Sequence, residues 1–416
     1  MQDFAQELVD SVIDLLHNDK AALKSCSLVC RSWEGPAHYH LFTSVTVTIG
    51  RPEEEWRSLP VFADLLDVSQ TLCTNIRNLK VEYDINGDQD GQGLVPLIGS
   101  NYLITPNDIA RVLEKLLKLR SLSFKHLLLG TYSADRSHPS QQFRLEHLTI
   151  EDCHSPDWGI LPEPMGQSLL DIMGLFIEID HLRLNRPAEL IGGAVNDSTG
   201  EVRDRVPVYI SSLSLLFPRQ GVPPLVHTVA KGLSFSKLTS FTVSCTHEDD
   251  IAAVGEILKT TGSTLLHLDF NLGQLDYDAL LRQLQEPLRI SPCTNLEHFV
   301  FRLAIEGYDR NYQQIAWEVT LRILLSVTRS LRTLTFLTFI SDPSALDELE
   351  RHYWIQFRER LNRFHHLESL AFTLPTEEEG TRTEEENTRF ERENAVVREF
   401  AQDMLPRLVA RGVIRI

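Results

Sequence analysis

A six-residue pattern of apolar and polar positions, apolar-x-x-apolar-x-apolar, recurs along most of the chain. Consecutive copies start 26 to 43 residues apart. In each copy the fourth and sixth residues are apolar and the fifth is mostly polar, an alternation typical of a short strand buried on one face. The pattern predicts ten short strands: IRNLKV (76–81), LRSLSF (119–124), LEHLTI (145–150), IDHLRL (179–184), ISSLSL (210–215), LTSFTV (238–243), LLHLDF (265–270), LEHFVF (296–301), LRTLTF (331–336) and LESLAF (367–372).

Segments with helical spacing of apolar residues precede several of these strands. They are DIARVLEKLLK (108–118), DDIAAVGEILKTTG (249–262), DYDALLRQLQ (276–285), VTLRILLSVTR (319–329) and LDELERHYWIQFRERLNRF (346–364). A repeated helix-then-strand unit cannot cover its own apolar face, so neighbouring units must stack. We therefore expect an α/β fold in which residues 43–416 form an irregular leucine-rich-repeat-like solenoid with short parallel strands and outer helices. A single doubly wound domain is the competing fold, and the lack of a nucleotide-binding fingerprint disfavours it.

The first forty residues have a different, wholly helical pattern. Leu8, Val12, Leu15 and Leu16 recur at helical spacing and predict a first amphipathic helix. Asn18 or Asp19 is placed to cap a second helix, whose apolar positions share one face: Ala22, Cys26, Val29 and Trp33. Gly35 and Pro36 are expected to end that helix, with Pro36 in the first turn of a short third one.

These N-terminal residues resemble an F-box. The residues that carry the resemblance are Glu7-Leu8, Val12, Leu16, Leu23, Ser27, Val29-Cys30 and Trp33, and DKAALKSCSLVCRSW is especially similar to fungal F-box-like proteins. The resemblance implies that residues 1–42 bind the Skp adaptor of a Skp-cullin-F-box ubiquitin ligase. The adaptor-binding residues that it implies are Phe4, Leu8, Val12, Leu16, Leu28, Val29 and Trp33. The family usually begins with Leu-Pro, where this chain has Phe4-Ala5.

The resemblance extends to the repeats, because fungal F-box-like proteins often end in degenerate repeats with a closing segment like LPRLVARGVIRI (405–416). It implies that the repeat region holds a protein target. The function expected is that of a substrate-receptor subunit with no catalytic activity of its own. The alternative is a non-catalytic repeat scaffold or sensor, whose helical head is a cap or a non-degradative adaptor module.

The composition limits the classes of partner and the cellular compartment that we expect for this protein. The 416 residues carry a formal net charge of −18, which disfavours nucleic acid and anionic membrane surfaces as partners. Six scattered cysteines in so long a chain are expected to be reduced core residues. No signal peptide or transmembrane span is evident, so we expect a cytoplasmic or nuclear protein.

Several constellations suggest chemistry, and each has a simpler interpretation. The alternating Asp84, Asn86, Asp88 and Asp90 lack the glycine and glutamate of a calcium loop. A zinc site could be drawn from Cys26, Cys30, His38 and His40, but cysteines one helical turn apart favour buried packing. No nucleophile elbow, phosphate loop or zinc-protease helix occurs. We expect no enzyme, no metal and no cofactor.

The polar positions of the predicted strands provide the candidate target site. The third residue is histidine in four copies, giving two pairs in successive units: His147 with His181, and His267 with His298. Adjacent strands lie about 4.8 Å apart, so each pair should sit side by side on the inner, concave face. With Arg183 and Asp269 at fifth positions, these histidines are the predicted target-binding residues. The simpler interpretation is a solvated position that varies among Ser, Thr and His.

Three segments fall outside the periodic pattern. The loops at 84–101 and 185–207 are rich in Gly, Pro, Asn and Asp and form the competing target site. The charge run at 376–395 is expected to be solvated surface.

Overall fold

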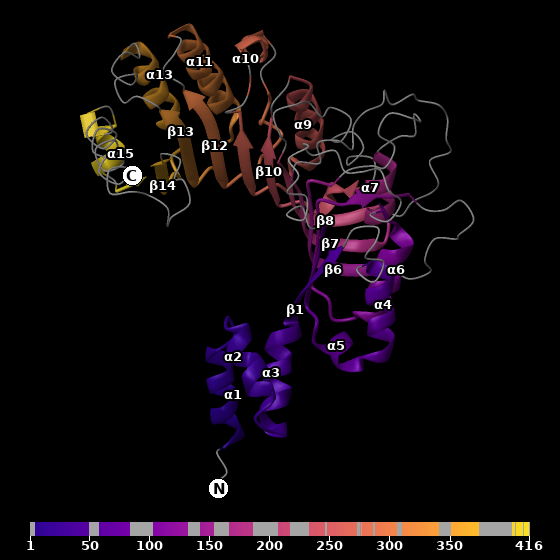
Figure 1. Cartoon of the computed structure of the whole chain (residues 1–416). Helices are drawn as coiled ribbons and strands as arrows, with labels where there is room; N and C mark the ends of the chain where they lie inside the picture. The colour runs from indigo at the N-terminus through magenta and orange to yellow at the C-terminus, as the bar shows by residue number, and fades with distance from the viewer. Residues whose placement is uncertain are drawn as a thin grey trace, which may run out of the picture. The chain divides into compact units, whose positions relative to one another are not determined.

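The fold is mixed α/β and divides into two compact units, Met1–Val208 and Tyr209–Ile416 (Figure 1). The computed structural model describes residues 5–49, 58–83, 103–131, 142–153, 166–185, 207–216, 233–245, 248–272, 275, 277–285, 288–305, 310–340, 351–373, 402–403, 405–410 and 412–415. The expected loops at 84–101 and 185–207, the calcium-like run and the charge run at 376–395 lie outside these residues, apart from Asn185 and Pro207.

Three helices form a head at the start of the first unit: α1 (Gln6–Leu15), α2 (Lys20–Ser27) and α3 (Arg31–Thr43). Their shared core consists of Val9, Ile13, Leu23, Cys26 and Ala37, with Leu16, Trp33 and Leu41 packed against it. The predicted cap of the second helix is Asp19, whose carboxylate accepts the N–H groups of Ala21 and Ala22.

The boundary between the second and third helices was predicted wrongly. The α2 helix ends at Ser27, and Pro36 lies inside α3 rather than at its start. Proline has no N–H to donate to the carbonyl four residues earlier, that of Ser32. The side-chain amide of Gln6 donates to this carbonyl instead, at 3.1 Å. A tertiary contact from α1 therefore offsets part of the cost of an internal proline.

A parallel sheet forms the body of the first unit. Its strands follow the order β1 (Ser44–Ile49), β2 (Asn78–Tyr83), β4 (Ser121–Lys125), β6 (Phe143–Glu151) and β7 (Phe176–Asn185). The helices of this body are α4 (Leu59–Val68), α5 (Gln70–Asn75), α6 (Pro106–Lys115) and α7 (Gly166–Met173). Figure 1 shows α4, α6 and α7 along one side of the strands. A separate short pair joins β3 (Leu103–Ile104) to β5 (Leu128–Leu129).

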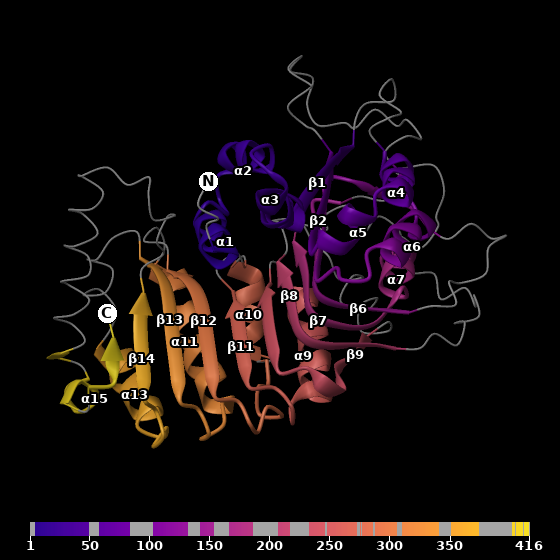
Figure 2. The same ribbon diagram turned by 90° about the horizontal axis from the view of Figure 1, so that it is seen from below.

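The second unit contains a parallel sheet of the same kind. Its order is β8 (Val208–Leu216), β10 (Ser240–Ser244), β11 (His267–Asn271), β12 (His298–Ile305), β13 (Thr333–Ile340), β14 (Ser369–Thr373) and β15 (Ile414–Arg415), with β9 (Leu233–Ser234) beside β8. The helices α9 (Glu248–Thr261), α10 (Tyr277–Gln285), α11 (Arg310–Ser326) and α13 (Arg351–Leu361) lie along one face of these strands (Figures 1 and 2).

All ten predicted strands are present and parallel. The first and fourth residues of every copy are buried, as is the sixth wherever its side chain is described. The strand β1, which the six-residue pattern did not reveal, precedes the first copy and pairs in parallel with β2. The predicted α/β class with parallel strands is therefore confirmed, whereas a domain boundary at residue 42 stays a prediction.

A repeated backbone contact fixes the strand register. The carbonyl of the second residue in a copy accepts two N–H groups from the following copy. Arg77 accepts from Arg120 and Ser121 at 2.7 and 3.0 Å, and Glu297 accepts from Arg332 and Thr333 at 2.8 and 2.9 Å. Because these bonds hold equivalent residues level, the third positions of neighbouring strands lie side by side.

Candidate functional site

The head carries large apolar side chains that its own core does not use. The exposed fractions are 58% for Leu8, 48% for Val12, 82% for Leu15, 86% for Leu28 and 62% for Val29. The first three lie at i, i+4 and i+7 on α1, while Leu28 and Val29 lie between α2 and α3. We call these five residues the apolar head surface. Leu8, Val12 and Leu15 share one side of α1, and exposed apolar patches commonly mark a surface that another molecule covers.

The α1 helix is apolar on more than the one face expected. The sequence grouped Leu8, Val12, Leu15 and Leu16 together, but Val9 and Ile13 are the α1 residues buried in the core. Leu16, just beyond the helix, packs against that core. The core therefore takes one side of α1 and leaves Leu8, Val12 and Leu15 at the surface.

The residues that the F-box resemblance implies for adaptor binding fall into three groups. Leu8, Val12, Leu28 and Val29 are exposed. Leu16 and Trp33 are partly buried against the head core. Phe4 lies outside the described residues.

Two side-chain contacts hold α1 against α3. His40 Nε2 lies 2.7 Å from Asp14 Oδ1, and Gln6 donates to the Ser32 carbonyl. Together with the shared core, these contacts fix the position of α1 and therefore that of the apolar head surface.

Cys30 does not pack beside Cys26 as expected. Cys26 is buried, but Cys30 is exposed because it lies beyond the end of α2, at the N-cap of α3. A hydrogen bond with the Ser32 hydroxyl, at 3.1 Å, lowers the pKa of the Cys30 thiol from its ordinary value. Across the described part of the chain, no three His, Cys, Asp or Glu side chains are grouped as metal ligands.

The other cysteines include three buried ones in the strand-containing bodies, as expected for reduced core residues. Burial raises the pKa of the Cys153 and Cys293 thiols to about 12 and also raises the pKa of Cys245. These groups are therefore thiols near neutral pH and poor nucleophiles.

The predicted pairing of the strand-face histidines is confirmed. The rings of His147 and His181 stack with centroids 4.7 Å apart and planes 11° apart. Those of His267 and His298 stack at 4.3 Å and 5°. Each pair occupies aligned positions on adjacent parallel strands. The two pairs lie in different units.

The two histidine pairs have different neighbours two residues further along their strands, on the same face of the sheet. Thr149 and Arg183 follow the first pair, and Asp269 and Val300 follow the second. Arg302 donates to both carboxylate oxygens of Asp269, with Nε–Oδ1 and Nη2–Oδ2 distances of 3.0 and 2.6 Å. The predicted anchor Asp269 is therefore already held within its own sheet.

The predicted target-binding residues also differ in their electrostatic surroundings. Desolvation, with a smaller contribution from His298, lowers the pKa of His267. Arg183 is exposed, and its side chain contacts no acidic partner among the described residues. Glu151 lies diagonally across from Arg183 on the neighbouring strand β6, but its carboxylate is 3.0 Å from Lys125 of β4, the strand on the other side of β6. Among the described residues, the guanidinium of Arg183 therefore has no charged partner.

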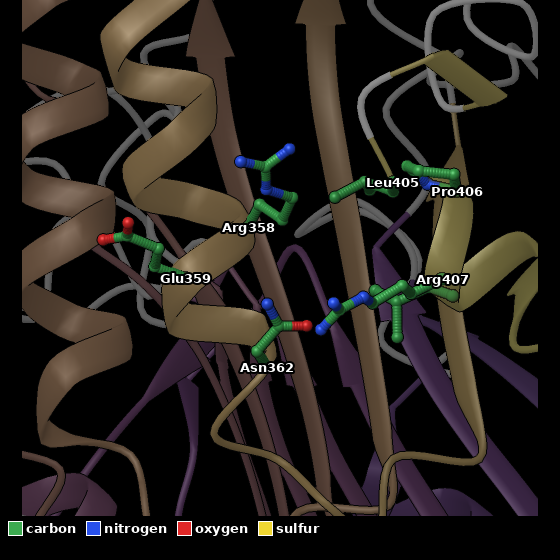
Figure 3. A pocket seen from close by; sticks show the side chains of 7 residues that line it. Arg358, Glu359, Asn362, Leu405, Pro406 and Arg407 are labelled. Atoms are coloured by element: carbon green, nitrogen blue, oxygen red, sulfur yellow. The ribbon is translucent and has the colours of Figure 1, made fainter.

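A pocket of about 310 Å³ in the second unit lies between α13 and α15 (Pro406–Ala410) (Figure 3). Its walls are Arg358, Glu359, Asn362, Leu405, Pro406, Arg407 and Leu408. In Figure 3 the guanidinium groups of Arg358 and Arg407 lie on the pocket side, while the carboxylate of Glu359 points away across α13.

Comparison with known proteins adds no relationship. No protein-family model matches the chain, and no curated protein matches it. The resemblance to fungal F-box-like proteins therefore rests on the residues of this chain alone, those of the head, the degenerate repeats and the closing segment at 405–416. None of the helices in the described ranges has both the length and the apolar character needed to cross a membrane.

Some residues of these surfaces were missed from the sequence. Leu15 was assigned to the apolar side of the first helix but not to the adaptor-binding residues, although its i, i+4, i+7 spacing with Leu8 and Val12 places it on the same side of α1. The Asp269–Arg302 pair required strand register, and Arg358 and Arg407 are far apart in the sequence. No local sequence signal marks the Asp269–Arg302 pair or the pocket that Arg358 and Arg407 both line.

Proposed function

We propose that the chain is a substrate-receptor subunit of a Skp-cullin-F-box ubiquitin ligase. The head binds the Skp adaptor, and the strand-containing body binds a protein target. Such a receptor catalyses nothing itself. It raises the effective concentration of the target near the ligase.

The apolar head surface is the observation that carries this proposal. The head closes a core of its own and still exposes five large apolar residues on α1 and before α3. Full burial of one such side chain contributes about 1.5–3 kcal/mol, so covering this surface supplies a substantial driving force for association. The F-box resemblance gives the occupant of the surface as the Skp adaptor.

The body supports the second half of the proposal. Its parallel strands repeat with helices between them, which fits a leucine-rich-repeat-like solenoid. The outward third and fifth strand positions do not contribute to the core and are free to contact a target. Cytoplasmic or nuclear localisation follows from the proposed partner.

Co-purification of the adaptor and cullin from cell extract tests the proposal. Leu8→Asp with Val12→Asp places two carboxylates in the expected contact and should abolish co-purification, because buried unpaired charges are costly. A matched control is Leu65→Asp with Val68→Asp, which changes two exposed apolar residues on α4. This control should retain both partners.

Two outcomes would contradict the proposal. If the wild-type chain captures neither the adaptor nor the cullin, the head is a cap or serves another purpose. If the head variant and the α4 variant capture the adaptor equally, the apolar head surface is not the adaptor site.

A further inference from the structure

The pocket between α13 and α15 is lined by two cations from separate elements. Arg358 comes from the last turn of α13 and Arg407 from α15. Within the described ranges, neither side chain has an ion-pair or hydrogen-bond partner. Glu359, the acidic residue in the pocket wall, directs its carboxylate to the other side of α13 (Figure 3).

The local fold compensates only a fraction of this charge. The C-terminal end of a helix carries the equivalent of about −0.5 charge, which Arg358 partly complements in the last turn of α13. Two guanidinium groups contribute about +2, and the Glu359 carboxylate lies on the other side of α13 from them, so a positive excess remains on the side of the arginines. This excess stands out in a chain of net charge −18.

We propose that this pocket binds a phosphate monoester group. Such a group carries about −1.5 to −2 charge near neutral pH and matches the two guanidinium groups. Its three terminal oxygens can accept from donors on different sides, which suits arginines presented by separate helices. Guanidinium groups also bind phosphate through paired N–H donors. A single carboxylate would leave half of the positive charge uncompensated.

Asn362 adds a neutral amide to the pocket wall, and in Figure 3 its oxygen is turned towards Arg407. Its side chain lies in the pocket wall one turn beyond Arg358 (Figure 3). An amide N–H can donate to an ester phosphate without adding charge. The remaining wall, Leu405, Pro406 and Leu408, is apolar and accommodates the group that carries the phosphate. This site does not depend on the head or on adaptor binding.

Titration calorimetry on the full chain tests the site with four probes. They are inorganic phosphate, glucose 6-phosphate, a five-residue peptide with both termini blocked whose single charged residue is a phosphoserine, and acetate. The three phosphates should bind, and acetate should bind at least about tenfold more weakly. Arg358→Ala and Arg407→Ala should each weaken phosphate binding about tenfold or more, since each removes charge-assisted hydrogen bonds.

Two further variants separate the pocket from general charge and folding effects. Arg329→Ala removes an exposed arginine of the same unit outside the pocket and should leave the Kd for phosphate unchanged. Arg407→Lys keeps the charge but loses the guanidinium fork, so its affinity should fall between those of wild type and Arg407→Ala. The circular dichroism and unfolding midpoint of every variant without phosphate should match wild type.

The results identify the source of the phosphate group as well as the site. Tighter binding of the phosphopeptide than of glucose 6-phosphate indicates a phosphorylated protein, and the reverse order indicates a phosphorylated metabolite. Unchanged phosphate affinity in Arg407→Ala would overturn the proposal. So would an equal loss in Arg329→Ala, or acetate binding as tight as phosphate binding.

Discussion

At the scale of single residues, the two stacked histidine pairs differ in what each can offer a partner. The first pair has Arg183 in the next row, exposed and without an acidic partner among the described residues. The second has Asp269 in the next row, already bonded to Arg302 through both carboxylate oxygens. The first pair therefore presents unused donors, whereas the charges beside the second pair are internally matched.

The pKa of His267 tests the electrostatics of the second pair. Burial and His298 both lower it, and Glu297 raises it. Changing His298→Gln removes the like-charged neighbour, so the pKa of His267 should rise towards its ordinary value. NMR titration of the His267 ring measures this shift. Ser240→Ala, on the other neighbouring strand, is the control. A pKa of His267 that does not rise in His298→Gln would contradict this account.

The same shift predicts the sign of the pH dependence of stability. Because the folded-state pKa of His267 is lowered, the unfolded chain binds this proton more readily. The contribution of His267 to the free energy of unfolding is therefore full above about pH 6.5 and declines as the pH falls towards its folded pKa.

At the scale of elements, α3 tests whether a tertiary hydrogen bond compensates for an internal proline. Removing the side-chain donor in Gln6→Ala should lower the opening free energy of α3 by about 0.5–1.5 kcal/mol. In a Pro36→Ala background the backbone can bond the Ser32 carbonyl itself, so Gln6→Ala should cost less there. Native-state hydrogen exchange of the α3 amides measures both effects. Equal costs in the two backgrounds would contradict the compensation.

The strands were predictable from the sequence because their register is encoded locally. The first, fourth and sixth positions are apolar in each copy. Because successive side chains of a strand point to opposite faces, the fourth and sixth positions determine which face is buried. The helix boundary at 28–30 was not predictable in the same way. Local rules place Pro36 at a helix start, and the contact that offsets part of the cost of its internal position comes from the distant Gln6 amide.

In the second unit, the sixth residues of three copies of the six-residue pattern form an aromatic core. The Phe270, Phe301 and Phe336 rings contact one another in sequence, with centroids of neighbouring rings 6.3 and 5.7 Å apart. Phe336 also contacts Phe357 of α13 at 5.2 Å. This series joins three consecutive strands to a helix.

Substitution of the central ring of this series measures its contribution. Phe301→Ala should reduce the free energy of unfolding by about 3–5 kcal/mol, because a large buried side chain leaves a cavity. Thr335→Ala, on the outward face of β13, should change it by less than about 0.5 kcal/mol. Urea unfolding of both variants measures the difference. Similar costs for the two would refute the assignment of faces.

At the scale of the whole molecule, the proposed target site is the outward strand face, and the long loops are the competing proposal. His181→Ala with Arg183→Ala should reduce capture of a co-purifying target if the strand face binds it, because both side chains are exposed there. Deleting 190–202 should leave capture intact. Unchanged capture in the first variant and loss in the second would refute the strand face and favour the loop.

The division into two units was not predicted, since the six-residue pattern runs across residue 208 without interruption. The candidate surfaces were predictable to different degrees. The histidine pairs followed from strand register, whereas the arginine pocket joins residues separated by 49 positions, at 358 and 407. Long-range contacts of this kind leave no periodic signal in the sequence.

Hydrogen exchange of the full chain with and without purified Skp adaptor tests the central claim most directly. The account predicts that the adaptor binds and that protection increases in α1 and at residues 27–34, where the apolar head surface lies. The amides of α4, which has exposed apolar residues of its own, should be unchanged. Absence of binding, or protection that spares α1 and residues 27–34, would contradict the assignment of the head as an adaptor-binding F-box.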